Sequence, residues 1–197
     1  MRPDPTILAF DTSAAHCAAA LLCAGKIEVR VDEMARGQAE HLMPMLEEVL
    51  AAQGLTWADL DAIGVGTGPG NFTGIRISVA AARGLALGLG IPAVGVSNFE
   101  AAAFGHARPV TVLIPAPRDQ AYAQSLAEGG PEAPLLLGPD DPRPTAALSP
   151  PPAHKMIAKM ARIAAGRFET EEARPAPLYV RAADAAPSRD APPVILP

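Results

Sequence analysis

TILAFDTSAAHCAAALLCAGKIEVRV, residues 6–31, decides the fold, because it contains three consecutive strand patterns joined by short turns. Residues 6–10 form an apolar run that ends in the polar sequence Asp11-Thr12-Ser13, as a buried strand does where it enters a turn. A second apolar run follows at residues 17–22. Residues 27–31 then alternate apolar and charged side chains, which indicates a strand with one solvated face. The stretch predicts an antiparallel meander of three strands.

Downstream of the meander, the apolar pattern changes to a helical period. Apolar side chains recur three and four residues apart within residues 41–53. Pro44 is compatible with this helix if it begins near His41, because first-turn N–H groups have no intrahelical partner. Two more strands, each followed by a helix, are expected at residues 62–66, 73–89, 91–96 and 98–104. This order predicts an α/β protein whose first lobe, residues 1–106, has a complete ribonuclease-H-like fold of the actin-like (ASKHA) kind.

The second half of the chain, residues 107–197, predicts a shortened and degenerate copy of such a lobe. A hairpin is expected from residues 110–114 and 121–126, with a further strand at 135–137. The Pro- and Asp-rich residues 138–152 indicate a loop. A helix at 154–165 and a short strand at 178–180 complete the lobe, and the tail from residue 182 has the composition of a weakly ordered segment.

Composition narrows the functional classes. The formal net charge is −5 and there is no run of Lys or Arg, which disfavours autonomous nucleic-acid binding. No signal-peptide pattern and no uninterrupted apolar stretch long enough to cross a bilayer is present, so no membrane association is expected. Cys17 and Cys23 fall on one expected strand, where the extended backbone keeps them too far apart to bridge. Free thiols indicate a reducing compartment, the cytoplasm.

Two turns are candidates for facing a nucleotide. The first is Asp11-Thr12-Ser13, where a carboxylate and small hydroxyls follow a strand; the alternative is a turn that only ends the hairpin. The second is the glycine-rich loop Thr67-Gly68-Pro69-Gly70-Asn71, which opens a helix that Asn71 or Thr73 can cap. This loop has neither the Lys-Ser/Thr of a Walker motif nor Rossmann spacing, so a tight strand-to-helix turn is the alternative.

The remaining polar residues do not form a recognisable catalytic or metal-binding set. The four histidines are isolated in the sequence, with no second ligand at metal-binding spacing, so no stoichiometric metal and no cofactor of the chain's own is expected. No Ser/His/Asp or Cys/His nucleophile signature is present, which makes a peptidase-like activity the least favoured possibility.

The chain resembles the TsaB (YeaZ) family over about its first 105 residues. The similar stretches are ILAFDTS, HLMPMLEEVL and, most specifically, the segment beginning GTGPGNFTGIR at residues 66–76. The resemblance implies a scaffold-like subunit of the bacterial complex that forms threonylcarbamoyladenosine beside the anticodon of tRNAs. It also implies two partners, a TsaD-like catalytic paralogue and a TsaE-like ATPase, with ATP and metal held by the partners and tRNA reached through the complex.

The paralogue TsaD shares the Gly-Pro-Gly region, but its implied His-x-x-x-His metal pair is not matched here. The corresponding positions are Asn98 and Ala102, and neither replaces an imidazole ligand. The resemblance therefore implies a subunit without catalysis of its own. An actin-like ATP-binding enzyme or phosphotransfer switch is the alternative, and nucleotide binding by the isolated chain distinguishes the two.

The resemblance also implies that helices 41–53 and 73–89 pair with their counterparts in TsaD. The residues expected at this interface are apolar or small: Leu42, Met45, Leu46, Val49, Ile75, Ser78, Val79 and Ala82. A free chain would then expose an apolar surface and could form a homodimer through it. On this hypothesis, Ser78→Arg abolishes partner binding and leaves the stability of the free chain almost unchanged.

Overall fold

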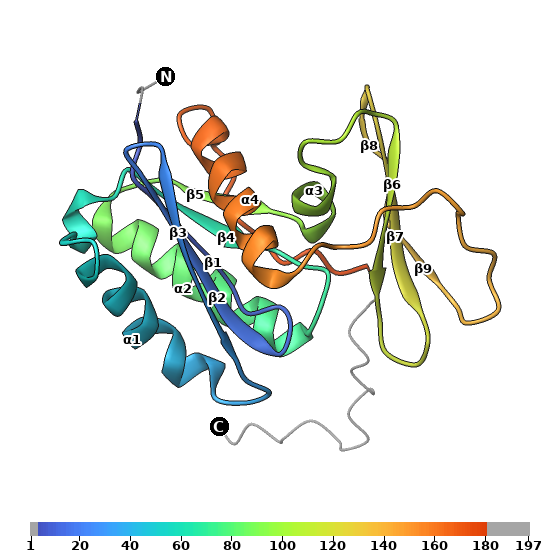
Figure 1. Cartoon of the computed structure of the whole chain (residues 1–197), viewed down its shortest axis with the longest axis horizontal. Helices are drawn as coiled ribbons and strands as arrows, with labels where there is room; N and C mark the ends of the chain where they lie inside the picture. The colour runs from blue at the N-terminus through green and yellow to red at the C-terminus, as the bar shows by residue number, and fades with distance from the viewer. Residues whose placement is uncertain (1–3, 181–197) are drawn as a thin grey trace, which may run out of the picture.

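A mixed five-stranded sheet lies at the centre of the first lobe (Figure 1). The computed structural model describes residues 4–180. The sheet has the order β3-β2-β1-β4-β5, where the strands are β1 (Ile7–Asp11), β2 (His16–Cys23), β3 (Lys26–Glu33), β4 (Ala62–Gly66) and β5 (Ala93–Val96). β1, β2 and β3 pair antiparallel, whereas β1, β4 and β5 pair parallel. The predicted meander with two crossover strands is confirmed, and with it the actin-like arrangement of this lobe.

Helices cover both faces of this sheet. α1 (Gln38–Ala51) and α2 (Phe72–Leu89) pack on one face, and α4 (Ala153–Arg167) packs on the other. A single 3₁₀ turn, η1 (Trp57–Asp59), precedes β4, and the short helix α3 (Asn98–Ala103) follows β5. α4 falls within the sequence range assigned to the second lobe, yet its apolar side chains complete the core beneath the first sheet. The first sheet is therefore sandwiched between α1 and α2 above and α4 below.

α1 begins earlier than its sequence predicts. The helix starts at Gln38 and not near His41, and the amide of His41 already donates to the carbonyl of Gly37 at 3.0 Å. Pro44 consequently lies inside the helix and not in its first turn. The proline is solvent-exposed, so the carbonyl left without its N–H donor can be hydrated.

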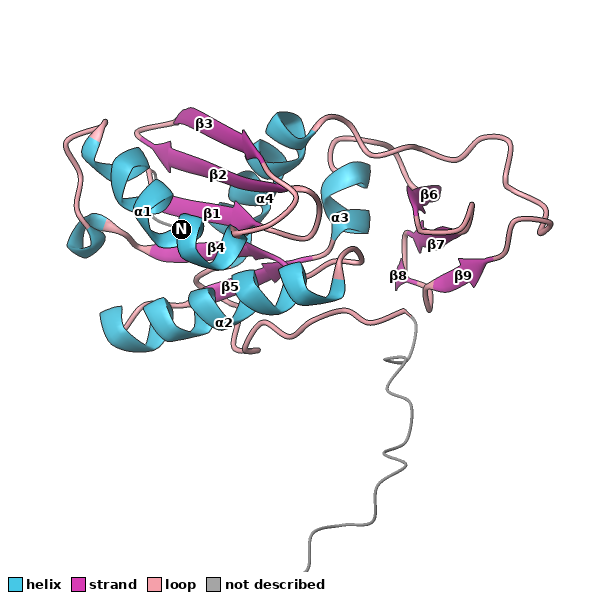
Figure 2. Ribbon diagram, turned by 90° about the horizontal axis from the view of Figure 1, so that it is seen from below, coloured by secondary structure: helices cyan, strands magenta, loops and turns pink. Residues whose placement is uncertain are grey.

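The second lobe is a small sheet that stands apart from the first (Figure 2). Its strands are β6 (Val110–Pro115), β7 (Ala121–Ala127), β8 (Gly130–Pro131) and β9 (Leu135–Leu137), with β7 in contact with the other three. The predicted hairpin and the third strand at 135–137 are confirmed. The strand predicted at 178–180 is wrong, because no strand is present there. The tail from residue 182 lies outside the described residues.

Side-chain and backbone contacts, and not a sheet, hold residues 178–180 in place. The amide of Leu178 donates to the carbonyl of Thr67 at 2.8 Å. The ring of Tyr179 lies 4.9 Å from that of Phe72 between centroids, and its hydroxyl accepts from Nε of Arg76 at 2.8 Å. The guanidinium of Arg76 also lies 3.9 Å from the centroid of the Phe72 ring, a cation–π contact. This segment is thus fastened to the start of α2.

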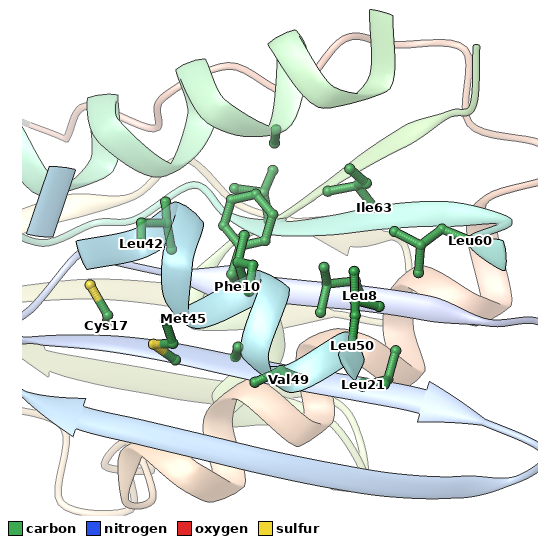
Figure 3. Packing of buried hydrophobic residues seen from close by; sticks show 14 of the residues in the cluster. Leu8, Phe10, Cys17, Leu21, Leu42, Met45, Val49, Leu50, Leu60 and Ile63 are labelled. Atoms are coloured by element: carbon green, nitrogen blue, oxygen red, sulfur yellow. The ribbon is translucent and has the colours of Figure 1, made fainter. Parts of the chain in front are cut away.

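The eight residues expected at a partner interface lie in the core of the chain itself. None is more than 7% exposed, and the α1 side chains point at β1 and β2, as Leu42, Met45 and Val49 do in Figure 3. Ser78 is fully buried and its hydroxyl donates to the carbonyl of Ile75 at 3.2 Å. The prediction of an exposed surface made by these side chains is therefore wrong. The helical spacing of these apolar side chains arises because they pack against the sheet. Ser78→Arg would therefore disrupt the core and would not test an interface.

Candidate functional site

A cavity of about 760 Å³ lies between the end of β1 and the second lobe. The turn after β1, the glycine-rich loop, the start of α3, the hairpin of β6 and β7, and the start of α4 all contribute to its wall. Of the residues predicted to face a nucleotide, four line the cavity: Asp11, Ser13, Gly70 and Asn71. Thr12 and Gly68 do not. The two predicted turns therefore meet at one place in the fold.

A chain of hydrogen bonds links the polar side chains of this wall. Oδ2 of Asp11 accepts from the amide of Ser13 at 3.1 Å and from its hydroxyl at 2.9 Å, and it lies 3.2 Å from Nε2 of His16. The Ser13 hydroxyl in turn accepts from Nδ2 of Asn98 at 3.1 Å. Nδ2 of Asn98 also donates to the carbonyl of Pro69 at 2.8 Å. One network thus joins β1, β2, α3 and the glycine-rich loop.

The geometry of this network does not activate Ser13 as a nucleophile. Both Ser13 and His16 contact the same oxygen of Asp11, and no hydrogen bond joins the serine hydroxyl to the imidazole. A serine nucleophile needs a base within hydrogen-bond reach that accepts its proton. Cys17 is no better, because burial, with the charges of Asp32 and Asp11 as further causes, raises the pKa of its thiol to about 11.

The contact with Asp11 raises the pKa of His16, since the hydrogen bond to the carboxylate favours the protonated ring more than burial opposes it. The protonated imidazole therefore stabilises the fold fully below its ordinary pKa, and the stabilisation is lost as pH rises through the raised value. We expect wild type to be more stable than His16→Gln at about pH 5.5, with the difference shrinking towards about pH 8.5. Chemical denaturation across this range measures the difference.

The control for this prediction is His106→Gln. His106 is exposed and has no carboxylate within ion-pair distance in residues 4–180. A gap between wild type and His16→Gln that stays constant across the pH range would contradict the ion pair with Asp11.

Glycines bring the two turns into contact. A Cβ on Gly70 would lie 2.3 Å from the carbonyl oxygen of Ser13, and one on Gly74 would lie 1.9 Å from that of Thr12. A Cβ on Gly66 would lie 2.0 Å from Oδ1 of Asp11, a buried oxygen that has no hydrogen-bond partner among residues 4–180. Glycine is needed at these positions because the backbone of Ser13 and Thr12 and the carboxylate of Asp11 come too close for a side chain. This agrees with a tight strand-to-helix turn, the alternative to a nucleotide-facing loop.

Two of the polar side chains predicted to face a nucleotide make hydrogen bonds within the protein instead. The hydroxyl of Thr12 is fully buried and donates to the carbonyl of Gly74 at 2.6 Å. The side chain of Asn71 caps α2 by accepting from the amide of Gly74 at 2.9 Å. Both hydrogen bonds fasten the start of α2 to the turn after β1, which leaves Asp11, Ser13 and His16 as the polar groups of the turn that line the cavity.

The charge of the cavity wall is poorly suited to a polyphosphate. Among the described residues that line it, Asp11 is the one carboxylate, His16 is the one group that can carry a positive charge, and no Lys or Arg is present. The rest of the wall is mainly Ala, Pro, Met and Ile. Within residues 4–180, no three His, Cys, Asp or Glu side chains are grouped as metal ligands.

Sequence reasoning missed the roles of His16 and Asn98 in this site. The role of His16 could have been predicted from the register of the β1–β2 hairpin. Asp11 pairs with Ala18, and His16 lies two residues before Ala18 on the same face of β2, within reach of Asp11 across the strands. Asn98 reaches Ser13 from 85 residues away in sequence, a contact that no local pattern contains.

Comparisons with known proteins support the resemblance to the TsaB (YeaZ) family that the sequence shows. The family model for TsaD, described as tRNA N6-adenosine threonylcarbamoyltransferase, matches residues 32–181. Haemophilus influenzae TsaB, named as a tRNA threonylcarbamoyladenosine biosynthesis protein, is 41% identical over 99 residues. An uncharacterized Mycobacterium tuberculosis protein is 33% identical over 92% of this chain and 94% of its own length. YeaZ from Pseudomonas aeruginosa superposes with a TM-score of 0.69 at 26% identity, over 89% of this chain and 99% of that one.

The chain belongs to the TsaB (YeaZ) family. The match to H. influenzae TsaB covers 50% of this chain and 42% of that protein, so it spans less than half the length of this relative. The similarity to the P. aeruginosa YeaZ structure, by contrast, includes the second lobe. The ASKHA fold predicted from the strand order is therefore the fold of the TsaB family.

Proposed function

We propose that this chain is a non-catalytic scaffold subunit of the bacterial complex that forms threonylcarbamoyladenosine beside the anticodon of tRNAs. In that role it binds and supports a TsaD-like catalytic paralogue, and a TsaE-like ATPase joins the same complex. The partner subunits bind ATP and metal, and the tRNA is modified in the cytoplasm. Family membership and the biosynthesis named for H. influenzae TsaB support this proposal.

The observation that carries the proposal is the outer face of α2. The helix contains no acidic residue, and it is the one helix in residues 4–180 long and apolar enough to cross a membrane, with 28% of its residues buried. Its inner face packs on the sheet. Its outer face combines small or apolar residues, with Leu87 82% exposed, and two arginines: Arg76, Ala80, Arg83, Gly84, Leu87 and Gly88. An exposed leucine among small residues leaves an apolar strip on the helix surface that a second helix can cover.

We assign this outer face to the TsaD-like partner. The small side chains permit close approach of a partner helix, and Leu87 supplies an apolar anchor. The interface thus stays on α2, as the family resemblance implies, but it moves from the buried side of the helix to its exposed side. In the absence of the partner, the same face offers a contact for a second copy of the chain.

The start of α3 supports a role without catalysis. Asn98 and Ala102 take the positions of the implied metal pair of TsaD, and both are buried. The amide nitrogen of Asn98 is already shared between Ser13 and Pro69. Neither side chain offers an imidazole to a metal ion.

Co-elution tests the proposal directly. We expect the chain and a TsaD-like protein of the same organism to form a one-to-one complex in size-exclusion chromatography at micromolar concentrations. Separate elution of the two proteins under these conditions would contradict the proposed function.

Nucleotide binding tests the alternative, an ATP-binding enzyme or phosphotransfer switch. A nucleoside triphosphate in the cavity would meet the carboxylate of Asp11 without a Lys or Arg to neutralise its phosphates. We expect calorimetry to detect no micromolar binding of ATP with Mg²⁺ to the isolated chain. Micromolar affinity together with ATP turnover would favour the alternative.

A further inference from the structure

The outer face of α4 carries three positive charges without ionic partners among the described residues. Lys155, Lys159 and Arg162 are spaced by four and three residues, which places them on one side of the helix. This side lies opposite the residues that pack on the sheet, Ile157 and Ala161 among them. The sequence has no run of basic residues, so helical periodicity is what gathers these three charges.

No acid in residues 4–180 forms an ion pair with this face. The 15 residues of α4 include no Asp or Glu, although the chain has a net charge of −5. Within residues 4–180, no ion pair involves Lys155, Lys159 or Arg162. Arg167, at the end of the helix, pairs instead with Glu100 at 2.7 Å. Burial and the neighbouring charge of Lys155 lower the pKa of Lys159, as expected for two cations without an anion between them.

We infer that this face of α4 binds the phosphate backbone of RNA. The three charges extend over about 10 Å of the helix, the length over which one strand of a duplex presents about three phosphates. Nζ of Lys159 donates to the carbonyl of Ala102 at 3.3 Å, and the exposed ring of Phe104 follows two residues later. A cationic face beside an exposed aromatic ring suits RNA, whose unpaired bases stack on such rings.

A membrane fits this face less well. The outer face of α4 itself includes none of the exposed large apolar side chains of residues 4–180, and the single ring of Phe104 beside it is a small apolar surface for insertion between lipids. The face also lies on the opposite side of the sheet from α2, which the proposed function assigns to the TsaD-like partner. The inference rests on that function, which brings a tRNA to the complex, and both surfaces can be occupied at once.

The test is the salt dependence of tRNA binding by the complex of this chain with its TsaD-like partner, using an unmodified tRNA transcript. The variant Lys155→Gln/Lys159→Gln/Arg162→Gln removes the three charges. We expect the slope of log affinity against log salt to become shallower by about 2 to 3. Between about 50 and 200 mM salt, the affinity of wild type then falls about 16- to 64-fold more than that of the variant.

The matched control is Lys26→Gln/Arg118→Gln/Arg174→Gln, which removes three exposed charges outside α4 and should keep the wild-type slope. An unchanged slope in the α4 variant, with co-elution of the TsaD-like partner retained, would overturn the inference alone. Loss of co-elution in wild type would instead contradict the proposed function. Charge-dependent binding of the chain to phosphatidylserine vesicles, with tRNA affinity unchanged in the variant, would assign the face to a membrane and overturn the inference.

Discussion

Gly74→Ala is expected to lower the free energy of unfolding by about 3 kcal/mol. The added Cβ would lie 1.9 Å from the carbonyl oxygen of Thr12 and 3.0 Å from its carbonyl carbon. Both are backbone atoms, and the hydrogen bond from the Thr12 hydroxyl to the carbonyl of Gly74 holds the two segments together. Relief of the overlap therefore requires α2 to move away from β1. Equilibrium denaturation in urea measures the loss.

Gly84→Ala is the matched control for this prediction. Gly84 lies in the same helix and a Cβ there would meet nothing within 4 Å. Because alanine restricts the unfolded chain and favours helix, we expect a gain of about 0.5 to 1 kcal/mol. Equal effects of the two substitutions would show that the close contact between α2 and the turn after β1 is not maintained in solution.

Gly84→Arg is expected to weaken binding of the TsaD-like partner by at least about 100-fold, equivalent to about 2.8 kcal/mol. The position lies at the centre of the exposed face of α2, between Ala80 and Gly88. An arginine there would hold the partner helix away and would bury a charge without an anionic partner. The free chain has room for the side chain, so its thermal stability should change little. Biolayer interferometry with the immobilised partner measures the affinity.

Gly166→Arg provides a control of the same chemistry on α4. This glycine is also exposed and helical, and a Cβ added to it would meet nothing within 4 Å, but it lies on the other side of the sheet. Its substitution should leave partner affinity unchanged. If Gly84→Arg binds the partner as tightly as Gly166→Arg does, the outer face of α2 is not the interface.

Much of the fold follows from patterns that are local in the sequence. Alternation in residues 27–31 and the apolar runs before them predict the meander, and the Gly-Pro-Gly loop predicts the break before α2. The start of α1 was misplaced because Pro44 is tolerated at an exposed interior position, where solvent can satisfy the carbonyl that loses its donor. The strand expected at 178–180 was wrong because side-chain contacts with Phe72 and Arg76 hold the segment instead.

The candidate site was only partly predictable for a different reason. An apolar helical stripe marks the side of a helix that is buried, but it does not say whether the covering surface belongs to the same chain. The predicted interface therefore fell on Leu42, Ser78 and their neighbours, which the sheet covers. The informative residues were the weakly apolar ones on the other side of α2, such as Ala80 and Gly84, whose exposure depends on the whole fold.

The contact between the turn after β1 and the glycine-rich loop also determines how the chain tolerates genetic variation. Gly66, Gly70 and Gly74 each face an oxygen atom at a distance that no side chain can occupy. A saturation-mutagenesis screen would therefore record these positions as intolerant even in a chain that never meets a nucleotide. The requirement to fold is enough to select against any larger residue at these three positions. Close packing alone therefore accounts for glycine at these three positions, and a phosphate ligand is not needed to explain them.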